Sequence, residues 1–467
     1  MHDLIRANAR TVLGWLERGE VSHMEVLDAL EARVGALDGA INALPTLCFE
    51  RARQHAQAIA ARPAGQRGVL GGLPVPIKDL CDVAGVRSTN ASPIYAEHVP
   101  TASAWTVERI EARGGVVYAK SNTPEFGAGA STFNEVFGRT ANPWGLSRSC
   151  AGSSGGAAAA LASGMAWLAQ GSDMGGSLRT PASFCGVVGL RPAPGRVPAG
   201  PGADAFGTLS VEGPMARNVG DLGLLLDAMA GPDPRDARSL PELPHFRASA
   251  EAPRLPRRVA FSPDLAITPV EPEVAALCER AARRFEALGV PVEEACPDFS
   301  GALECFQTLR GLAFATSHAR HYAEHRALLK PDIVWNIERG LAVTGEEVAR
   351  AHLVRSRIVA ETARFFETYD LLLCPTAIVT PFPVETRTVT ECAGTPFETY
   401  IDWLAIVAAI TLSAAPALSL PCGFTGEGLP VGLQMVGRLR GEAALLSHAA
   451  VLEAELGLDT GPIEPRP

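Results

Sequence analysis

Two turns rich in glycine and serine hold the residue types in this chain that are best suited to nucleophilic chemistry. The first reads GSSGG over residues 152–156, and the second reads GSDMGGS over residues 171–177. Glycine has no side chain, so its backbone can approach a ligand closely and turn N–H groups toward one point. A serine hydroxyl beside such groups can act as a nucleophile if a base accepts its proton. The rest of the chain must therefore supply that base.

The first turn fits the pattern G-x-S-x-G with Ser154 at its centre, which is typical of the nucleophile elbow of α/β-hydrolases. That elbow follows a strand, and the preceding residues 142–151 (NPWGLSRSCA) do not predict one. It also needs an acid and a histidine downstream. The downstream histidines lie in predicted helices and outside any motif: His318, His321, His325 and His352. A phosphate-binding loop is excluded because no Gly-Lys-Ser/Thr follows the glycines, and a dinucleotide fingerprint lacks its strand and acidic partner.

Composition and charge exclude several classes of protein. The chain has 467 residues, 47% hydrophobic and 20% charged, which is typical of a globular protein with a substantial core. A net charge of −10 argues against a nucleic-acid-binding surface. No segment approaches the length of a membrane span, and the N-terminus predicts an amphipathic helix, so a cytoplasmic enzyme is expected. The ten cysteines include no CxxC pair, and Cys150 is expected to be a small buried residue.

The elements that must position the two turns alternate between helices and strands. Helical periodicity occurs at residues 4–18, 22–37, 49–61, 105–113, 272–288 and 441–456. Extended apolar segments occur at residues 71–82, 114–120, 257–265, 289–295, 370–375 and 413–438. Residues 301–369 are predicted to be mostly helical. This alternation is typical of an α/β fold.

A series of motifs along the chain resembles the amidase signature family. In order, they are LPVPIKDLCDVAG, KSNTPEFGAGASTFNEVFGRTANPW, AGSSGGAAAALASG, GSDMGGSLRTPASFCGVVGLRP, APALSLPCG and GLPVGLQ. The resemblance covers nearly the whole chain and is densest over about residues 68–200. One departure is the Ser-Cys-Ala sequence at residues 149–151, where the family often has Thr-Pro-Gly. The resemblance implies one domain over residues 1–467, an α/β/α sandwich with a large central mixed β-sheet, and a helical insertion at about 301–369 that caps the pocket.

The same resemblance assigns roles to the residues of both turns and to one lysine. Lys78, Ser153 and Ser177 would form a Ser–cisSer–Lys triad. Ser177 would be the nucleophile and Lys78 the terminal base, with Ser153 between them after a cis peptide bond. Lysine accepts a proton near neutral pH only if burial lowers its pKa by a few units.

Further positions around the triad take supporting roles through the resemblance. The backbone N–H groups of four residues would form the oxyanion hole: Met174, Gly175, Gly176 and Ser177. Asp173 and Arg179 would form an ion pair that holds the turn. Ser154 and Ser172 would be hydrogen-bond partners, and the Gly127 carbonyl would face the substrate amide.

The function implied by the resemblance is hydrolysis of a carboxamide C–N bond through an acyl-enzyme on Ser177. No metal or organic cofactor is implied. The expected partner is a small-molecule amide, without direct nucleic-acid or membrane binding, and a homodimer is compatible with this function. One alternative is the A-type subunit of a glutamine-dependent tRNA amidotransferase, which needs partner subunits. Another is a catalytically silent scaffold subunit. The substrate stays open, because it depends on variable loops such as residues 301–345 and 376–400.

Overall fold

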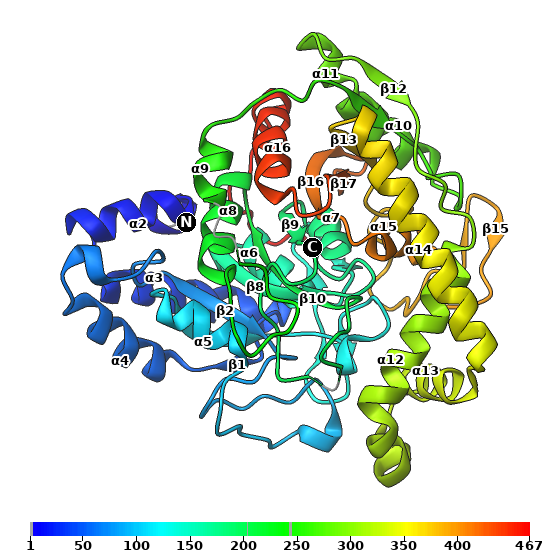
Figure 1. Cartoon of the computed structure of the whole chain (residues 1–467). Helices are drawn as coiled ribbons and strands as arrows, with labels where there is room; N and C mark the ends of the chain where they lie inside the picture. The colour runs from blue at the N-terminus through cyan, green and yellow to red at the C-terminus, as the bar shows by residue number, and fades with distance from the viewer. Residues whose placement is uncertain (1–2, 203, 242–244) are drawn as a thin grey trace.

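An eight-stranded mixed β-sheet runs through the centre of the computed structural model, which describes residues 3–202, 204–241 and 245–467 (Figure 1). Strand β11 is parallel to β12 and β13, and the remaining neighbours are antiparallel. In spatial order the strands are β12 (Val292–Glu294), β11 (Val259–Phe261), β13 (Leu371–Pro375), β17 (Pro430–Val436), β16 (Ala417–Phe424), β9 (Val188–Arg191), β10 (Val211–Ala216) and β8 (Leu168–Asp173). The predicted α/β fold with a large central mixed sheet is confirmed.

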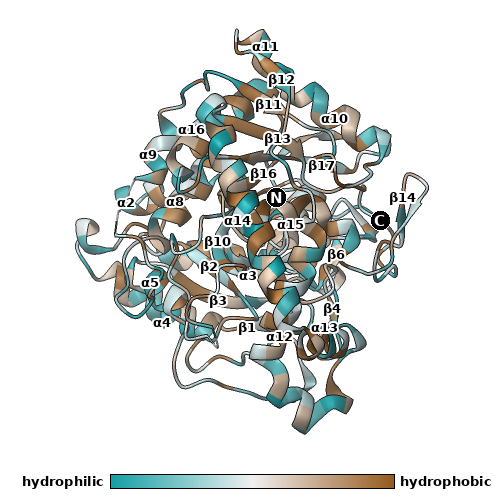
Figure 2. Ribbon diagram, turned by 45° about the vertical axis from the view of Figure 1, so that its right-hand side comes forward, coloured by the Kyte–Doolittle hydropathy of each residue, from teal (hydrophilic) through white to brown (hydrophobic). Residues whose placement is uncertain are grey.

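Helices cover both faces of this sheet, because its central strands are apolar on both sides. Successive side chains of a strand point to opposite faces. Leu371 packs in one apolar cluster with residues of α10 (Pro272–Ala282) and α16 (Glu442–Leu456). Leu372 packs in a second cluster with residues of α15 (Ala405–Ser413). The central strands are accordingly among the most hydrophobic segments of the ribbon (Figure 2).

A smaller three-stranded sheet carries the lysine of the predicted triad. It consists of β1 (Thr46–Leu47), β3 (Val116–Ser121) and β2 (Pro74–Lys78), with β2 parallel to β3. Strand β2 packs against β8 of the large sheet, so the two sheets meet where β2 ends. The other helices of this part and of the outer layers are α1 (Asp3–Arg6), α2 (Ala9–Arg18), α3 (His23–Ile41), α4 (Phe49–Ala60), α5 (Trp105–Ala112), α6 (Gly155–Ala162), α7 (Arg179–Cys185), α8 (Val219–Met229), α9 (Phe246–Glu251) and α11 (Arg284–Ala287).

The predicted helical segment 301–369 consists of α12 (Ala302–His325), α13 (Pro331–Ala342) and α14 (Gly345–Thr368). Helices α12 and α13 cross closely at two glycines. A Cβ atom on Gly340 would lie 1.9 Å from the carbonyl oxygen of Gly311, so only glycine fits at this crossing. None of the described helices is long and apolar enough to cross a membrane.

One expectation about the first glycine turn is wrong. The sequence of residues 142–151 predicts no strand, but β7 (Gly145–Ser149) pairs with β6 (Ala141–Asn142) just before the turn. The physical reason is tertiary, because the Ser149 N–H donates to the carbonyl of Phe382 at 2.8 Å. The remaining short strands are β4 (Phe133–Asn134), β5 (Gly138–Arg139), β14 (Glu391–Cys392) and β15 (Thr395–Pro396). Since β7 lies outside the central sheet, it does not create the strand of an α/β-hydrolase elbow.

Candidate active site

The buried side chain of Lys78 brings the two glycine turns together. Lys78 is the last residue of β2 and is fully buried. Its Nζ donates to Ser153 Oγ at 2.7 Å and to Ser154 Oγ at 2.9 Å, both in the first turn. It also donates to Ser172 Oγ at 3.1 Å, in the second turn. The structure thus places a lysine amine among three serine hydroxyls, away from bulk water.

Ser177 lies beside this cluster and is joined to it through the backbone. The N–H of Ser154 donates to the carbonyl of Ser177 at 3.1 Å. The peptide bond between Gly152 and Ser153 is cis, as the resemblance implied. Ser153 is buried, whereas Ser177 is half-buried and therefore accessible to a ligand. Among the described residues, the Ser177 hydroxyl has no hydrogen-bond partner, so the direct contact in the predicted triad is that between Lys78 and Ser153.

Burial lowers the pKa of the Lys78 ammonium to about 8. Desolvation is the largest cause, because the charged form loses its water inside the protein. The nearby Glu212 carboxylate acts in the opposite direction and keeps the pKa from falling further. A lysine with such a pKa is partly neutral near physiological pH and can accept a proton.

Sequence reasoning did not find Glu212 or Gln170, which lie next to the lysine. In the antiparallel pair of β10 and β8, Glu212 is directly opposite Ser172. Gln170 accepts from the Lys78 backbone N–H at 2.9 Å and donates to the Glu212 carboxylate. Burial raises the pKa of Glu212, and Lys78 partly offsets this increase. No local pattern marks these residues, because only the pairing of the strands brings them to the site.

The second turn is fixed by a buried carboxylate. Asp173 accepts from Arg179 at 2.8 and 3.0 Å, and both side chains are fully buried. The predicted Asp173–Arg179 ion pair is therefore present, and Arg191 adds a second guanidinium. Burial alone would raise the pKa of Asp173, but the two guanidiniums lower it well below its usual range. Arg179 also donates to the Val407 carbonyl, the Thr411 hydroxyl and the Gln434 side chain.

The same carboxylate changes the predicted oxyanion hole. The Gly176 N–H donates to Asp173 Oδ1 at 2.9 Å and is therefore engaged. In the described part of the chain, the N–H groups of Met174, Gly175 and Ser177 have no hydrogen-bond acceptor. The four predicted donors are thus reduced to three free donors. A Cβ atom on Gly175 would lie 2.8 Å from the Phe306 ring of α12, so the turn and the helix are in close contact.

Gly127 lies on the other side of Ser153. It ends the short 3₁₀ helix η3 (Glu125–Gly127), and its φ of 72° favours glycine. A Cβ atom at this position would lie 3.5 Å from Ser153 Oγ. Gly127 therefore adjoins the serine cluster. That its carbonyl faces the substrate amide stays a prediction.

Two rival nucleophiles do not fit the geometry. The Ser154 hydroxyl is buried against Lys78 and Ser172, which makes it a partner of the lysine and not an exposed elbow serine. The thiol of Cys150 is buried and donates to the carbonyl of Thr140 at 3.4 Å. Burial raises the pKa of Cys150 to about 12, so its reactive thiolate form is scarce.

Comparison with known proteins decides the family. The family model described as Amidase matches residues 25–446. This chain belongs to the amidase signature family. It is 38% identical to the A subunit of the glutamyl-tRNA(Gln) amidotransferase of Moorella thermoacetica, over 97% of both chains. It is 36% identical to an acylamidase of Rhodococcus erythropolis, over 93% of this chain and 92% of the other.

Solved structures show the same fold over nearly the whole chain. A bacterial aryl acylamidase of the amidase signature family superimposes with a TM-score of 0.90 at 26% identity, over 96% of both chains. A 6-aminohexanoate cyclic dimer hydrolase, solved in complex with its substrate, gives a TM-score of 0.87 at 30% identity, over 98% of both. As a member of this family, the chain is a hydrolase of amide C–N bonds.

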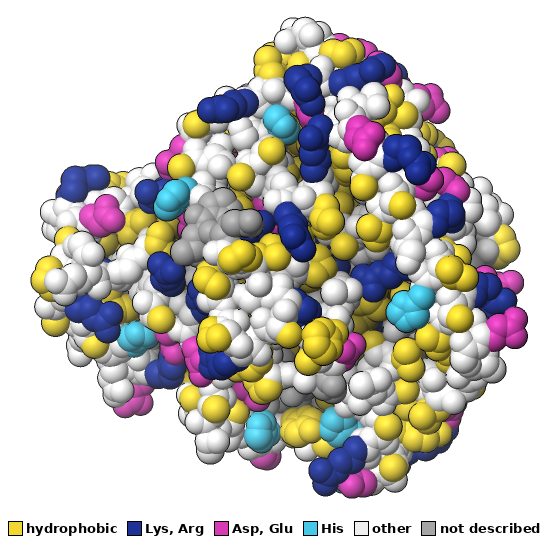
Figure 3. Space-filling model, in the orientation of Figure 1, with side chains coloured by type: hydrophobic (Ala, Val, Ile, Leu, Met, Phe, Trp, Pro, Cys, Tyr) yellow, Lys and Arg dark blue, Asp and Glu magenta, His cyan; other side chains and the backbone are white. Residues whose placement is uncertain are grey.

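A cleft of about 730 Å³ leads to the second glycine turn, residues 171–177, through Met174. This turn carries Ser177 and is called the nucleophile turn below. Met174 lines the cleft, together with Leu309 of α12, the loop formed by residues 204–210, and Val211 and Glu212 at the start of β10. Phe206 of this loop is 76% exposed. Hydrophobic and basic side chains occur together on this face of the molecule (Figure 3). Within residues 3–202, 204–241 and 245–467, no group of three or more His, Cys, Asp or Glu side chains could hold a metal ion.

The Asp173 ion pairs predict a large effect on stability. We expect Asp173→Asn to lower the free energy of unfolding by about 3–5 kcal/mol, because it leaves two buried guanidiniums without their carboxylate. Urea denaturation would measure this. Asp28→Asn is a matched control, since Asp28 pairs with Arg53 on the surface and such pairs contribute little. Similar losses in the two variants would contradict the role given to Asp173.

Proposed function

We propose that this chain hydrolyses small carboxamides through an acyl-enzyme on Ser177, with Ser153 as proton relay and Lys78 as base. The observation that carries the proposal is the 2.7 Å contact between Lys78 Nζ and Ser153 Oγ in a fully buried site. It supplies the base that a serine nucleophile needs. The family's hydrolysis of amide bonds and the half-buried position of Ser177 next to this pair also support it.

In the acylation step, Ser177 Oγ attacks the amide carbonyl carbon while its proton passes to Ser153. Ser153 passes its own proton to neutral Lys78. The substrate carbonyl oxygen becomes negatively charged and accepts hydrogen bonds from backbone N–H groups of the nucleophile turn. A single such donor typically contributes about two to three orders of magnitude in rate. Return of the proton to the leaving nitrogen breaks the C–N bond and releases ammonia or an amine.

Deacylation reverses the proton path. Water attacks the acyl ester on Ser177, loses a proton to the Ser153–Lys78 pair, and Ser177 leaves with a proton as the acid is released. Proton transfer from Ser177 to Ser153 needs a hydrogen bond between their hydroxyl groups. This hydrogen bond forms in the substrate complex, as is common for catalytic hydrogen bonds that are incomplete without a ligand. No step in this sequence requires an added cofactor.

The mechanism predicts that each triad residue is essential. Ser177→Ala, Ser153→Ala and Lys78→Ala should each lower kcat for a simple amide by at least about 1000-fold, because the three residues act as a unit. Ammonia or amine release would measure this. Cys150→Ala is the control, since its thiol is buried and has no step in the mechanism. Turnover at the wild-type level in any of the three triad variants would disprove the mechanism.

The pKa of Lys78 predicts how activity depends on pH. The lysine must be neutral to accept a proton, so kcat/KM should rise with pH, with a midpoint near the pKa of about 8, and then level off. Glu212→Gln should move that midpoint to lower pH, because it removes the carboxylate that favours the charged lysine. A midpoint at the ordinary lysine value of 10.5, or no shift in the variant, would contradict this assignment.

A second candidate function is that of the glutaminase component of a tRNA-dependent amidotransferase. It is favoured by the 38% identity to the Moorella thermoacetica amidotransferase chain over 97% of both chains. The two functions differ in their need for partners. The purified chain alone should hydrolyse aryl or aliphatic amides if it is an independent amidase. Activity confined to glutamine, and present only in the company of partner proteins, would favour the second candidate.

A further inference from the structure

Arg310 of α12 is a buried cation with unusual partners. Only 7% of the Arg310 residue is exposed to solvent. Nε donates to Asn336 Oδ1 at 3.2 Å, and Nη2 donates to the Tyr400 hydroxyl at 3.0 Å. Nη1 donates to the thioether sulfur of Met174 at 3.3 Å, which is a weak acceptor. Every acceptor of this guanidinium is therefore a neutral side chain.

The charge of Arg310 is not balanced by an ion pair. Across the described residues, no carboxylate lies within 4.0 Å of this guanidinium. Asp332, on the neighbouring helix α13, pairs instead with Lys330 at 3.4 Å. A guanidinium has five N–H donors, and three are used here, so one on Nη1 and one on Nη2 are free. A buried charge is costly unless an anion accompanies it, which suggests that a ligand supplies the anion.

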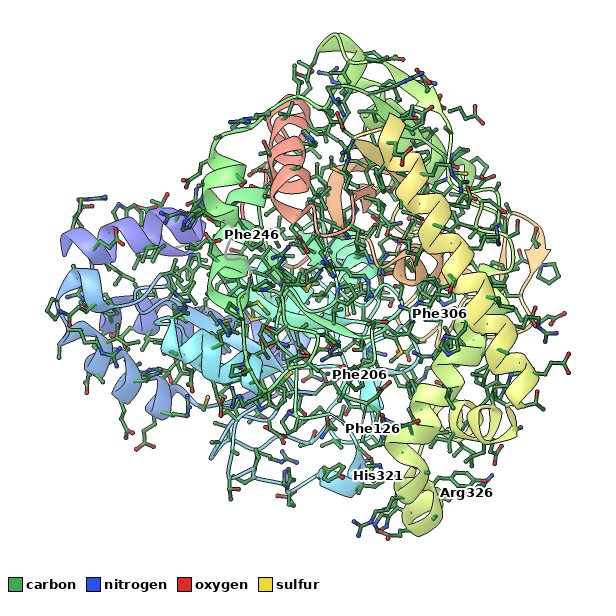
Figure 4. All side chains as sticks on the ribbon, viewed as in Figure 1. Phe126, Phe206, Phe246, Phe306, His321 and Arg326 are labelled. Carbon is green, nitrogen blue, oxygen red and sulfur yellow. The ribbon has the colours of Figure 1, made fainter. Side chains whose placement is uncertain are left out.

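Arg310 also lies beside the reacting centre. Phe306, Arg310 and Phe314 are spaced by four residues and share one side of α12. The Phe306 ring contacts the Gly175 backbone, and the Arg310 guanidinium stacks 4.5 Å from the Phe314 ring. Figure 4 shows Phe306 and His321 on α12, with Phe126 and Phe206 beside the same helix. Arg310 is the charged member of a stripe that faces the nucleophile turn.

Met174 connects this cation to the space open to a substrate. Its backbone N–H is one of the free donors of the nucleophile turn, and its side chain lines the 730 Å³ cleft. The sulfur that Arg310 contacts belongs to the same half-buried residue. Tyr400 and Trp335, whose rings pack 5.8 Å apart, are also only partly buried. Arg310 itself is not among the residues that line the cleft, so a ligand reaches its Nη1 by displacing the methionine side chain.

We propose that Arg310 binds a carboxylate carried by the amide substrate, so that the preferred substrates are monoamides of short dicarboxylic acids. This inference rests on the proposed function. The free N–H groups on Nη1 and Nη2 form the fork that a carboxylate accepts in a bidentate pair. The scissile amide then lies at the Ser177 end of the substrate, and the carboxylate lies beyond Met174.

Arg355 is a competing anchor and provides a matched control. Unlike Arg310, it lines the cleft directly, and it too has no carboxylate within ion-pair distance among the described residues. Its donors are used differently, because Nη2 donates to Thr208 Oγ1 at 2.7 Å and Nε to the Leu412 carbonyl at 3.4 Å. These contacts join the loop to α15, and one of them is to a backbone carbonyl, whereas every acceptor of Arg310 is a side chain.

The kinetic test compares glutaric monoamide with pentanamide, a neutral amide of the same chain length. The wild-type protein should prefer the anionic substrate in kcat/KM by on the order of 10- to 100-fold, mainly through KM, because charge-assisted hydrogen bonds add to binding. Arg310→Met should reduce this ratio to about one, Arg310→Lys should keep part of it, and Arg355→Met should keep most of it. Thermal unfolding checks that each variant is folded, and Arg310→Lys serves if Arg310→Met is not.

A binding test separates this inference from the proposed function. Glutarate is titrated into Ser177→Ala by calorimetry, with glutaramide as the neutral control ligand. Glutarate should bind to Ser177→Ala, more weakly to Ser177→Ala combined with Arg310→Lys, and not to Ser177→Ala combined with Arg310→Met at the same concentration. Hydrolysis of pentanamide without preference for the anion, no binding of glutarate, or loss of the preference only in Arg355→Met would overturn the role of Arg310. Failure to hydrolyse either amide would instead count against the proposed function, while glutarate binding still decides the Arg310 site.

Discussion

The buried carboxylate of Asp173 is the interaction on which the nucleophile turn depends. It ends β8, accepts the N–H of Gly176, and binds the guanidiniums of Arg179 and Arg191. Through Arg179 the same network reaches α15 and β17, which lie far away in the sequence. Two guanidiniums on one carboxylate offset the cost of burying these charges. The turn is therefore held by electrostatics as well as by its glycines.

Lys78 is a second buried ionisable group in the same site, and its surroundings favour the neutral form where those of Asp173 favour the charged form. Its amine is surrounded by serine hydroxyls, and the Glu212 carboxylate acts on it without a direct ion pair. Asp173 keeps its charge because guanidiniums contact it, whereas Lys78 loses part of its charge because burial lowers its pKa. An ionised carboxylate and a partly neutral amine thus act on adjacent residues of the nucleophile turn, since Lys78 contacts Ser172, the residue before Asp173.

Helices α12 and α14 line one side of the cleft, and α13 packs on α12. The glycine crossing of α12 and α13 allows the helices to pack tightly. Helix α12 then places Phe306 on the Gly175 backbone and Arg310 on the Met174 side chain.

Local sequence is enough to predict the alternation of elements, and the motifs of the whole sequence, through a family resemblance, point to the side chains proposed for catalysis. Apolar patterns indicate the strands and helices because they depend on neighbouring residues, and the resemblance to the amidase signature family assigns the triad to Lys78, Ser153 and Ser177. Other features follow from the tertiary fold alone: Glu212 near the lysine, the engaged Gly176 N–H, the strand β7, and Arg310 beside Met174. These features depend on pairings between distant segments, where packing and hydrogen bonds override local preference, and no residue spacing encodes them.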